Sequence, residues 1–275
     1  MISFLCLTIC VILGMTPHLG QKDSEEGDSM AYKKPNDIKI EVLYDNNSYR
    51  KGLMTGWGFS CLITGAKKTI LFDTGGNANV LTNNMQELEI DPKDIDIIIL
   101  SHIHGDHVGG LGSILEKNPK LTVYLPESFP DRFKSDVTKY GAKIIEVDKP
   151  LTIDNMVYST GQLGTSIKEQ SLIVRTDKGM IVITGCAHPG IVTIVKRAKE
   201  IIKDDVLLVL GGFHLTGRSK DEIEKIILSF RKLGVHYVGP CHCTGYTARK
   251  SFEKAFKDNF ITVGAGKVIE VGDMK

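Results

Sequence analysis

The sequence has little of what marks several classes of protein. Its 275 residues include one tryptophan and 7% aromatic residues, and basic and acidic residues nearly balance at 34 against 33. A net charge of +1 gives no bulk electrostatic reason to expect a nucleic-acid partner, and so few aromatics offer no stacking platform for bases. No internal repeat, dinucleotide-binding fingerprint or P-loop occurs. What is left is an ordinary globular chain, 42% hydrophobic.

Cysteines are too few and too irregularly spaced for a disulfide framework. The six stand at positions 6, 10, 61, 186, 241 and 243, and no two of them form a CxxC pair. Cys186 lies close to a histidine, and Cys241 and Cys243 flank another. Thiols beside imidazoles are typical of metal or active-site chemistry, so the spacing favours such a site over disulfides.

The first 34 residues differ from the rest, and we interpret them as a signal-like or anchoring segment with a linker. Residues 3–15 are uncharged and apolar, which is too short for a membrane span but fits the apolar region of a signal peptide. No Lys or Arg precedes this run. We expect export or membrane association through residues 1–20; the alternative is a later start, at Met30, and a cytoplasmic protein. Residues 35–275 are expected to form the catalytic domain.

The hydrophobic pattern from residue 38 onward predicts alternating groups of strands and helices. Strands are expected at 38–44, 59–64, 69–73, 95–100, 122–125, 143–147, 156–160, 170–176, 180–184, 206–210 and 237–239, with two more closing the chain. Helices are expected at 77–88, 109–116, 190–202, 221–233 and 247–257. Strands followed by helices in both halves suit two sheets packed face to face with helices outside. The predicted fold class is therefore α/β, an αββα sandwich.

The strongest chemical signal is the segment SHIHGDH at 101–107, directly after a continuous apolar strand. Imidazole and carboxylate groups at this density are suitable ligands for zinc, iron or manganese. We predict one or two divalent ions per chain, zinc first, with manganese or iron as alternatives. The ligands predicted here are His102, His104, Asp106 and His107. Asp106 is also expected to act in catalysis by orienting a nucleophilic water.

Three more histidines each follow a predicted apolar strand. Because strand ends gather at one sheet edge, where sites in such proteins form, we predict His188 and His242 as further metal ligands. His214 is predicted to be catalytic, as a pocket residue that contacts substrate or stabilises developing charge. The alternative for each one is a polar side chain satisfied within a turn. His18 and His236 lack this context and are expected to be structural or exposed.

These motifs resemble the metallo-β-lactamase-fold superfamily of metal-dependent hydrolases. The His-x-His-x-Asp-His loop at 102–107 matches its signature, and the turn at 71–75 (LFDTG) matches its early turn, whose Asp supports the metal loop. Segments 184–190 (TGCAHPG), 211–215 (GGFHL) and 240–245 (PCHCTG) are similar to one group within it. That group includes the archaeal 7,8-dihydropterin-6-yl-methyl-4-(β-D-ribofuranosyl)aminobenzene 5′-phosphate synthase.

The resemblance implies a function as well as a fold. The expected activity is metal-dependent hydrolysis of a small anionic ester or phosphoester by metal-activated water. The alternative is a transferase that condenses a dihydropterin with a ribofuranosylaminobenzene phosphate, and a metal-bound redox or sensor protein is less favoured. The sequence does not indicate an oligomeric state.

The chain departs from the superfamily pattern at one place. Typical members have a Gly-His ligand ahead of a strand that ends in a metal-bridging Asp, but 161–170 contains no His and the strand ends in Gly185-Cys186. We therefore expect His188 to supply the missing imidazole, and Cys186 to be either a thiolate ligand or a small buried residue. The expected half-sites are His102, His104 and His188 around one ion, and Asp106, His107 and His242 around the other. Without a bridging carboxylate, the second ion should be held more weakly.

Overall fold

Strand pairing in the computed structural model gives two sheets that face each other. The structure describes residues 37–275, which belong to one compact unit, Lys33–Lys275. The signal-like segment and linker predicted over 1–34 lie outside the described residues. Within 37–275, no helix combines the length and apolar character needed to span a membrane.

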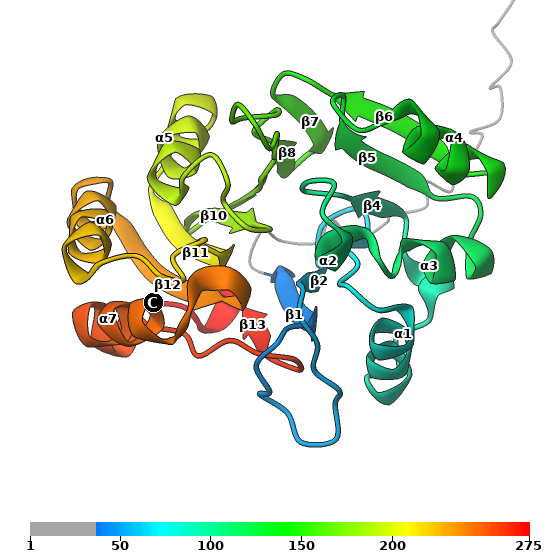
Figure 1. Ribbon diagram of the computed structural model, residues 1–275. Helices are drawn as coiled ribbons and strands as arrows, with labels where there is room; N and C mark the ends of the chain where they lie inside the picture. Colours follow the sequence, from blue (N-terminus) through cyan, green and yellow to red (C-terminus); the bar gives the residue numbers. More distant parts are fainter. Residues whose placement is uncertain (1–36) are drawn as a thin grey trace, which may run out of the picture. The chain divides into compact units, whose positions relative to one another are not determined.

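The first sheet has the strand order β13-β1-β2-β3-β4-β5-β6 (Figure 1). Its strands are β1 (Lys39–Tyr44), β2 (Ser60–Thr64), β3 (Ile70–Phe72), β4 (Ile97–Ile99), β5 (Thr122–Pro126), β6 (Lys143–Val147) and β13 (Val268–Glu270). Strands β3 to β6 are parallel to one another. The turn after β3 and the predicted metal loop after β4 therefore leave the sheet at the same edge.

The second sheet has the order β12-β11-β10-β9-β8-β7. Its strands are β7 (Leu151–Asp154), β8 (Val157–Ser159), β9 (Leu172–Thr176), β10 (Gly179–Thr184), β11 (Val206–Gly212) and β12 (Val235–Cys241). Strands β10, β11 and β12 run parallel, so their carboxyl ends share one edge. The three histidines that follow these strands are thereby delivered to the same place.

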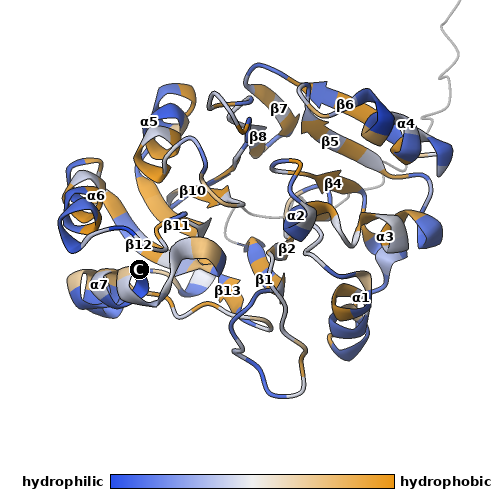
Figure 2. Ribbon diagram, viewed as in Figure 1, coloured by the Kyte–Doolittle hydropathy of each residue, from blue (hydrophilic) through white to orange (hydrophobic). Residues whose placement is uncertain are grey.

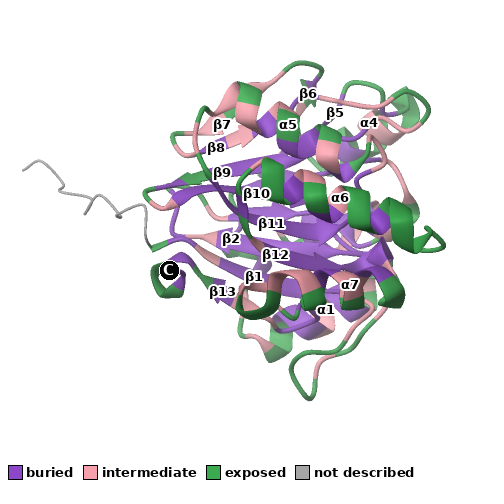
Figure 3. Ribbon diagram, turned by 90° about the vertical axis from the view of Figure 1, so that its left-hand side faces the viewer, coloured by how far each residue is buried: buried purple, intermediate pink, exposed green. Residues whose placement is uncertain are grey.

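Alternating side chains divide the interior into three apolar layers. On β4, Ile97 and Ile99 face the core between the sheets, whereas Ile98 packs under the helices of the first sheet. On β10, Ile183 faces the central core and Val182 faces the helices of the second sheet. Strands accordingly appear hydrophobic and buried, while the outward sides of the helices are polar and exposed (Figures 2 and 3). This is the αββα sandwich expected from the sequence.

The helices lie on the two outer faces. Those beside the first sheet are α1 (Ala78–Glu87), α2 (Gly105–Val108), α3 (Leu111–Lys117) and α4 (Asp131–Lys139). Those covering the second sheet are α5 (Ile191–Ile201), α6 (Lys220–Lys232) and α7 (Tyr246–Phe256). Short 3-10 turns occupy Pro92–Asp94, His242–Thr244, Lys257–Asn259 and Val271–Asp273.

Two elements that the pattern did not predict, α4 and β7, have few buried apolar residues. Helix α4 is polar on average and buries only Val137, and β7 is a partly exposed edge strand, so neither gives a strong hydrophobic signal. The expectation of two closing strands is wrong, since only β13 forms and Phe260 makes a single bridge to Val238. The closing strand pairs with β1, with Ile40 opposite Ile269.

Candidate metal centre

The six predicted ligands meet where the edges of the two sheets come together. The ring centroids of His102 and His104 are 4.6 Å apart, and each lies 4.8 Å from that of His188. On the other side, the centroids of His107 and His242 are 5.1 Å apart. The centroids of His102 and His107, from different predicted half-sites, are 4.2 Å apart, so these side chains form one cluster, and both the division into half-sites and the ligand roles stay predictions.

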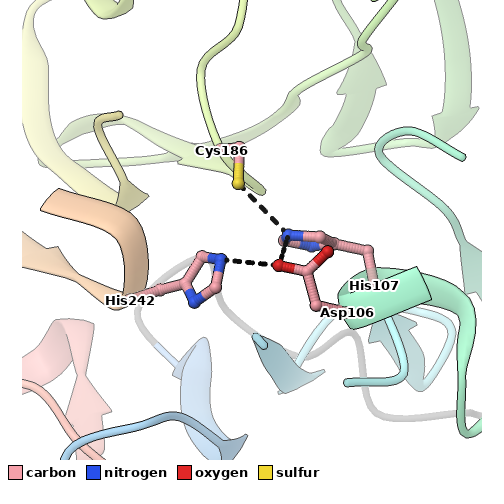
Figure 4. A group of neighbouring side chains, drawn as sticks. All are labelled: Asp106, His107, Cys186 and His242. Atoms are coloured by element: carbon pink, nitrogen blue, oxygen red, sulfur yellow. Dashed lines mark hydrogen bonds and ion pairs between the residues drawn. The ribbon is translucent and has the colours of Figure 1, made fainter. Parts of the chain in front are cut away.

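Donor atoms in the second half-site are spaced as ligands of one ion. Asp106 Oδ2 lies 3.3 Å from His242 Nε2 and 3.6 Å from His107 Nε2. Cys186 Sγ lies 3.3 Å from His107 Nε2 (Figure 4). Bonds of about 2.0–2.1 Å to nitrogen or oxygen and about 2.3 Å to sulfur give tetrahedral edges of roughly 3.3–3.6 Å. The observed spacing fits a zinc-sized ion.

Two buried imidazole nitrogens lack any polar partner among the described residues, Nε2 of His102 and of His188, while His242 Nε2 has only the 3.3 Å contact with Asp106 Oδ2. Leaving a buried polar atom unpaired costs about 1–3 kcal/mol, so these atoms need a partner that the chain does not supply. Burial and the neighbouring imidazoles lower the pKa of His102 far below its ordinary value. Burial and His214 lower the pKa of His188 to about 4. Both rings are therefore neutral at neutral pH, with lone pairs free to bind a metal.

Asp73 fixes the metal loop from behind, as the resemblance implied. This fully buried carboxylate accepts hydrogen bonds from Ser101 N, Ser101 Oγ and His107 Nδ1, each at 2.7 Å. Ser101 Oγ in turn lies 2.9 Å from His102 Nδ1. Holding the Nδ1 atoms in this way turns the Nε2 atoms of both rings toward the site.

Two further supports are residues that sequence reasoning missed. Glu169 is 1% exposed and accepts hydrogen bonds from the backbone N–H groups of residues 186, 187 and 188, at 3.0, 2.9 and 2.8 Å. Asn46 Oδ1 lies 2.9 Å from His242 Nδ1, and Asp45 Oδ2 accepts the His242 N–H at 3.1 Å. An acid at the start of an apolar strand is a signal that could have identified Glu169. Nothing in the loop 45–58 distinguishes Asn46.

Cys186 lies in the middle of the site, whereas His214 lies at its rim. The thiol is buried, and the hydrogen bond with Cys243 together with burial raises its pKa in the metal-free protein. His214 is exposed, and its ring centroid is 4.5 Å from that of His188. A hydrogen bond with Cys243 raises the pKa of His214, which favours the charged ring. His214 is placed as the predicted pocket residue, and its donor atom forms a third group with the two thiols.

Residues 58–209 match the family model described as the Metallo-beta-lactamase superfamily. This chain belongs to that superfamily. It is 32% identical over 287 residues to the 7,8-dihydropterin-6-methyl-4-(beta-D-ribofuranosyl)-aminobenzene-5'-phosphate synthase of Methanocaldococcus jannaschii, covering 86% of this chain and 98% of the relative. The solved structure of Tm1679, described as a metal-dependent hydrolase of the beta-lactamase superfamily, is also 32% identical, with a TM-score of 0.72 and coverage of 86% and 100%. The metallo-beta-lactamase fold protein YhfI from Bacillus subtilis, 16% identical with a TM-score of 0.61 and coverage of 85% and 99%, shows the fold alone.

Membership of the metallo-beta-lactamase superfamily confirms the resemblance inferred from the motifs, and with it the fold. It also implies that the chain binds divalent metal, which the donor groups described above fit. The preference for zinc over manganese or iron stays a prediction.

In this metallo-beta-lactamase-fold chain, a cleft of about 330 Å³ adjoins the centre at His188, the one predicted metal ligand among its lining residues. His188 and His214 form its inner wall, the first turn of α5 forms a second wall, and α6 forms the outer wall. Arg218 and Lys225 line the outer wall, where Arg218 Nη1 donates to Glu222 Oε1 at 3.1 Å. Positive charge therefore faces the space next to the predicted ligands.

Proposed function

We propose that this chain is a metal-dependent hydrolase that cleaves a small anionic ester or phosphoester. The observation that carries the proposal is the set of unpartnered, buried imidazole nitrogens gathered beside Asp106. Such an arrangement binds divalent ions through neutral nitrogen donors and keeps a carboxylate at the open side. Bound ions of this kind supply a water of lowered pKa and polarise the ester.

Asp106 is suited to orienting that water. Burial acts to raise its pKa, but contact with His242 and the charge of His107 prevail and lower it to about 2. The carboxylate is therefore ionised at neutral pH and is a constant hydrogen-bond acceptor. Its side chain keeps 20% of its surface exposed, so the carboxylate is reached by solvent while Oδ2 contacts the imidazoles.

The cleft supports an anionic substrate. Lys225 forms no ion pair with any described residue, and Arg218 shares its charge only with the exposed Glu222. His214 lies beside His188 and lines the same cleft as these cations, where its charged ring would stabilise negative charge developing on the leaving oxygen. Hydrolysis then needs three things from the chain: Asp106 to orient water, His214 to stabilise charge, and α6 to hold the anionic group.

The second candidate is a condensing transferase of pterin cofactor biosynthesis. It is favoured by one observation, the similarity to the Methanocaldococcus jannaschii synthase over nearly the whole length of both chains. The same cleft would then have to admit two substrates and exclude water from the reacting carbon.

The test is a screen of metal-loaded protein in ¹⁸O-water against phosphoesters, lactones and the pterin plus ribofuranosylaminobenzene phosphate pair. Hydrolysis places ¹⁸O in the product, whereas condensation joins the two substrates without it. His104→Ala and Asp106→Ala should abolish activity and lower metal content while leaving the fold intact. His214→Asn should lower kcat by about 100-fold, as loss of a charge-stabilising donor does, with metal content unchanged. Condensation of the pterin pair without hydrolysis of any ester would replace this proposal with the second candidate.

A further inference from the structure

Cys186 is the member that the two groups of donor atoms share. One group contains Asp106, His107, Cys186 and His242, and the other contains His102, Cys186 and His188; within each, all donor atoms lie within 4.8 Å of one another. Cys186 follows β10, and its thiol points toward His107 of the first group (Figure 4). A single sulfur is thus within reach of both predicted half-sites.

The backbone around Cys186 is fixed so that the sulfur stays there. Gly185 packs so closely on the metal loop that a Cβ at this position would lie 2.2 Å from Ser101 Oγ and 2.9 Å from Asp73 Oδ2. The next turn is held by Glu169, which accepts three successive N–H groups from residues 186–188. Ala187 has a φ of 61°, which reverses the chain and brings His188 back to the site. Cys186 therefore lies at a defined position between the loops.

We propose that the Cys186 thiolate bridges two metal ions, one held by Asp106, His107 and His242 and the other by His102, His104 and His188. The bridge takes the place of a carboxylate that this chain does not have. This proposal rests on the metal dependence of the proposed function, but it does not depend on which substrate is used or which reaction is catalysed. Binding transfers the thiol proton to solvent and forms two metal–sulfur bonds, with no change in oxidation state.

A sulfur bridge has a consequence for the choice of metal. Thiolate is a soft donor that favours zinc, whereas carboxylate and water favour magnesium and manganese. The other donors are five imidazoles and one carboxylate, which suit zinc equally well. A thiolate-bridged centre therefore favours thiophilic ions, and we expect manganese to bind far more weakly than zinc.

The competing role for this thiol is a partnership with Cys243 instead of with metal. Cys243 Sγ donates to the Cys186 carbonyl at 3.6 Å, and the two sulfurs belong with His214 to a third donor group. Cys243 is buried like Cys186 but does not belong to either of the two groups above. Cys243→Ser is therefore the matched control for Cys186→Ser.

The experiment loads chelator-stripped protein with cobalt(II) and measures metal content together with thiolate-to-cobalt charge-transfer absorption in the near ultraviolet. Wild type and Cys243→Ser should bind two ions and show this absorption. Cys186→Ser should lose it and bind the second ion more weakly, by more than the roughly 10- to 100-fold typical of a lost outer partner. Cys186→Asp should lose the absorption yet regain two ions, because a carboxylate restores the bridge.

Three outcomes would overturn the bridge: absorption that persists in Cys186→Ser, absorption that disappears in Cys243→Ser, or Cys186→Ser that keeps both ions at wild-type affinity. Circular dichroism of the stripped variants shows whether each has folded. If Cys186→Ser has not folded, the metal content and absorption of Cys186→Asp test the bridge instead. Two cobalt ions without charge transfer would refute the bridge and leave the metal dependence intact. Charge transfer without hydrolysis of any ester would refute the proposed function and leave the bridge intact.

Discussion

Two segments of the centre, the loop 101–107 on the first sheet and the turn 185–188 on the second, are each held by a buried carboxylate, but the two carboxylates work differently. Asp73 contacts a predicted ligand directly, through His107 Nδ1, and so sets both the orientation and the charge of that ring. Glu169 contacts only the backbone N–H groups of 186–188 and Thr184 Oγ, and so sets the path of the chain. One side is organised through its side chains and the other through its main chain. Substitutions of Asp73 and of Glu169 should therefore affect stability and the histidines of the site differently.

The largest effect should come from removing Asp73. Asp73→Ala leaves His107 Nδ1 and Ser101 N–H buried without their acceptor, and breaking a buried pair costs about 3–5 kcal/mol. Urea unfolding in the presence of chelator measures this loss separately from metal binding. Asp136→Ala removes an exposed partner of Lys139 and should cost under about 0.5 kcal/mol. A loss below about 1 kcal/mol for Asp73→Ala would mean that His107 does not depend on this carboxylate.

Glu169→Gln should have a smaller and more selective effect. The neutral amide keeps one acceptor oxygen, but its NH₂ group replaces the other oxygen and faces a backbone N–H group of 186–188. We expect this to lower the free energy of unfolding by about 2–3 kcal/mol. Histidine NMR spectra of zinc-titrated protein should show His188 perturbed while His102 and His107 keep their wild-type response. Glu200→Gln, at an exposed pair with Arg197, is the control. Equal perturbation of all three rings would contradict a division of labour between the two carboxylates.

Gly185→Ala tests the close contact between the turn 185–188 and Ser101 at the start of the metal loop. A new Cβ would lie 2.2 Å from Ser101 Oγ, and overpacking of this kind costs about 1–3 kcal/mol. Gly105→Ala lies in the metal loop itself but meets nothing within 4 Å, and it should be neutral or slightly stabilising. Thermal melting of both stripped variants checks the contrast. Equal melting temperatures would show that the contact between Gly185 and Ser101 can adjust to a new Cβ without loss of stability.

The smallest effect is expected in the cleft. Lys225→Ala should raise KM for an anionic ester by up to about fivefold, the value of an exposed charge contact, and leave stability within about 0.5 kcal/mol. Lys232→Ala, on the same helix but outside the lining of the cleft, should leave KM unchanged. An unchanged KM for Lys225→Ala would remove this residue from substrate binding.

The same comparison shows which parts of the site could be predicted from the sequence. The loop 101–107 was recognisable because its predicted ligands are contiguous and follow an apolar strand, and Asp73 stands in a motif of its own. His188 and His242 could be placed because their strands end at the same edge. Asn46 could not, since it acts across a tertiary contact that leaves no local pattern, and Glu169 left only a weak signal, an acid just before an apolar strand. Likewise, the central position of Cys186 depends on the close packing of Gly185 against Ser101.

The pairing of β13 with β1 has a consequence for how the molecule is made. Ile40 lies opposite Ile269, so the sheet that presents the metal loop gains this strand only after every other described strand has been made. At about 5–20 residues per second, a ribosome needs on the order of ten to thirty seconds to travel from His107 to that strand. Until residue 242 has been made the histidines of the loop lack His242, and until β13 has been made they lack a closed sheet around them. A complete metal centre can therefore form only after the segment that carries His242 has left the ribosome.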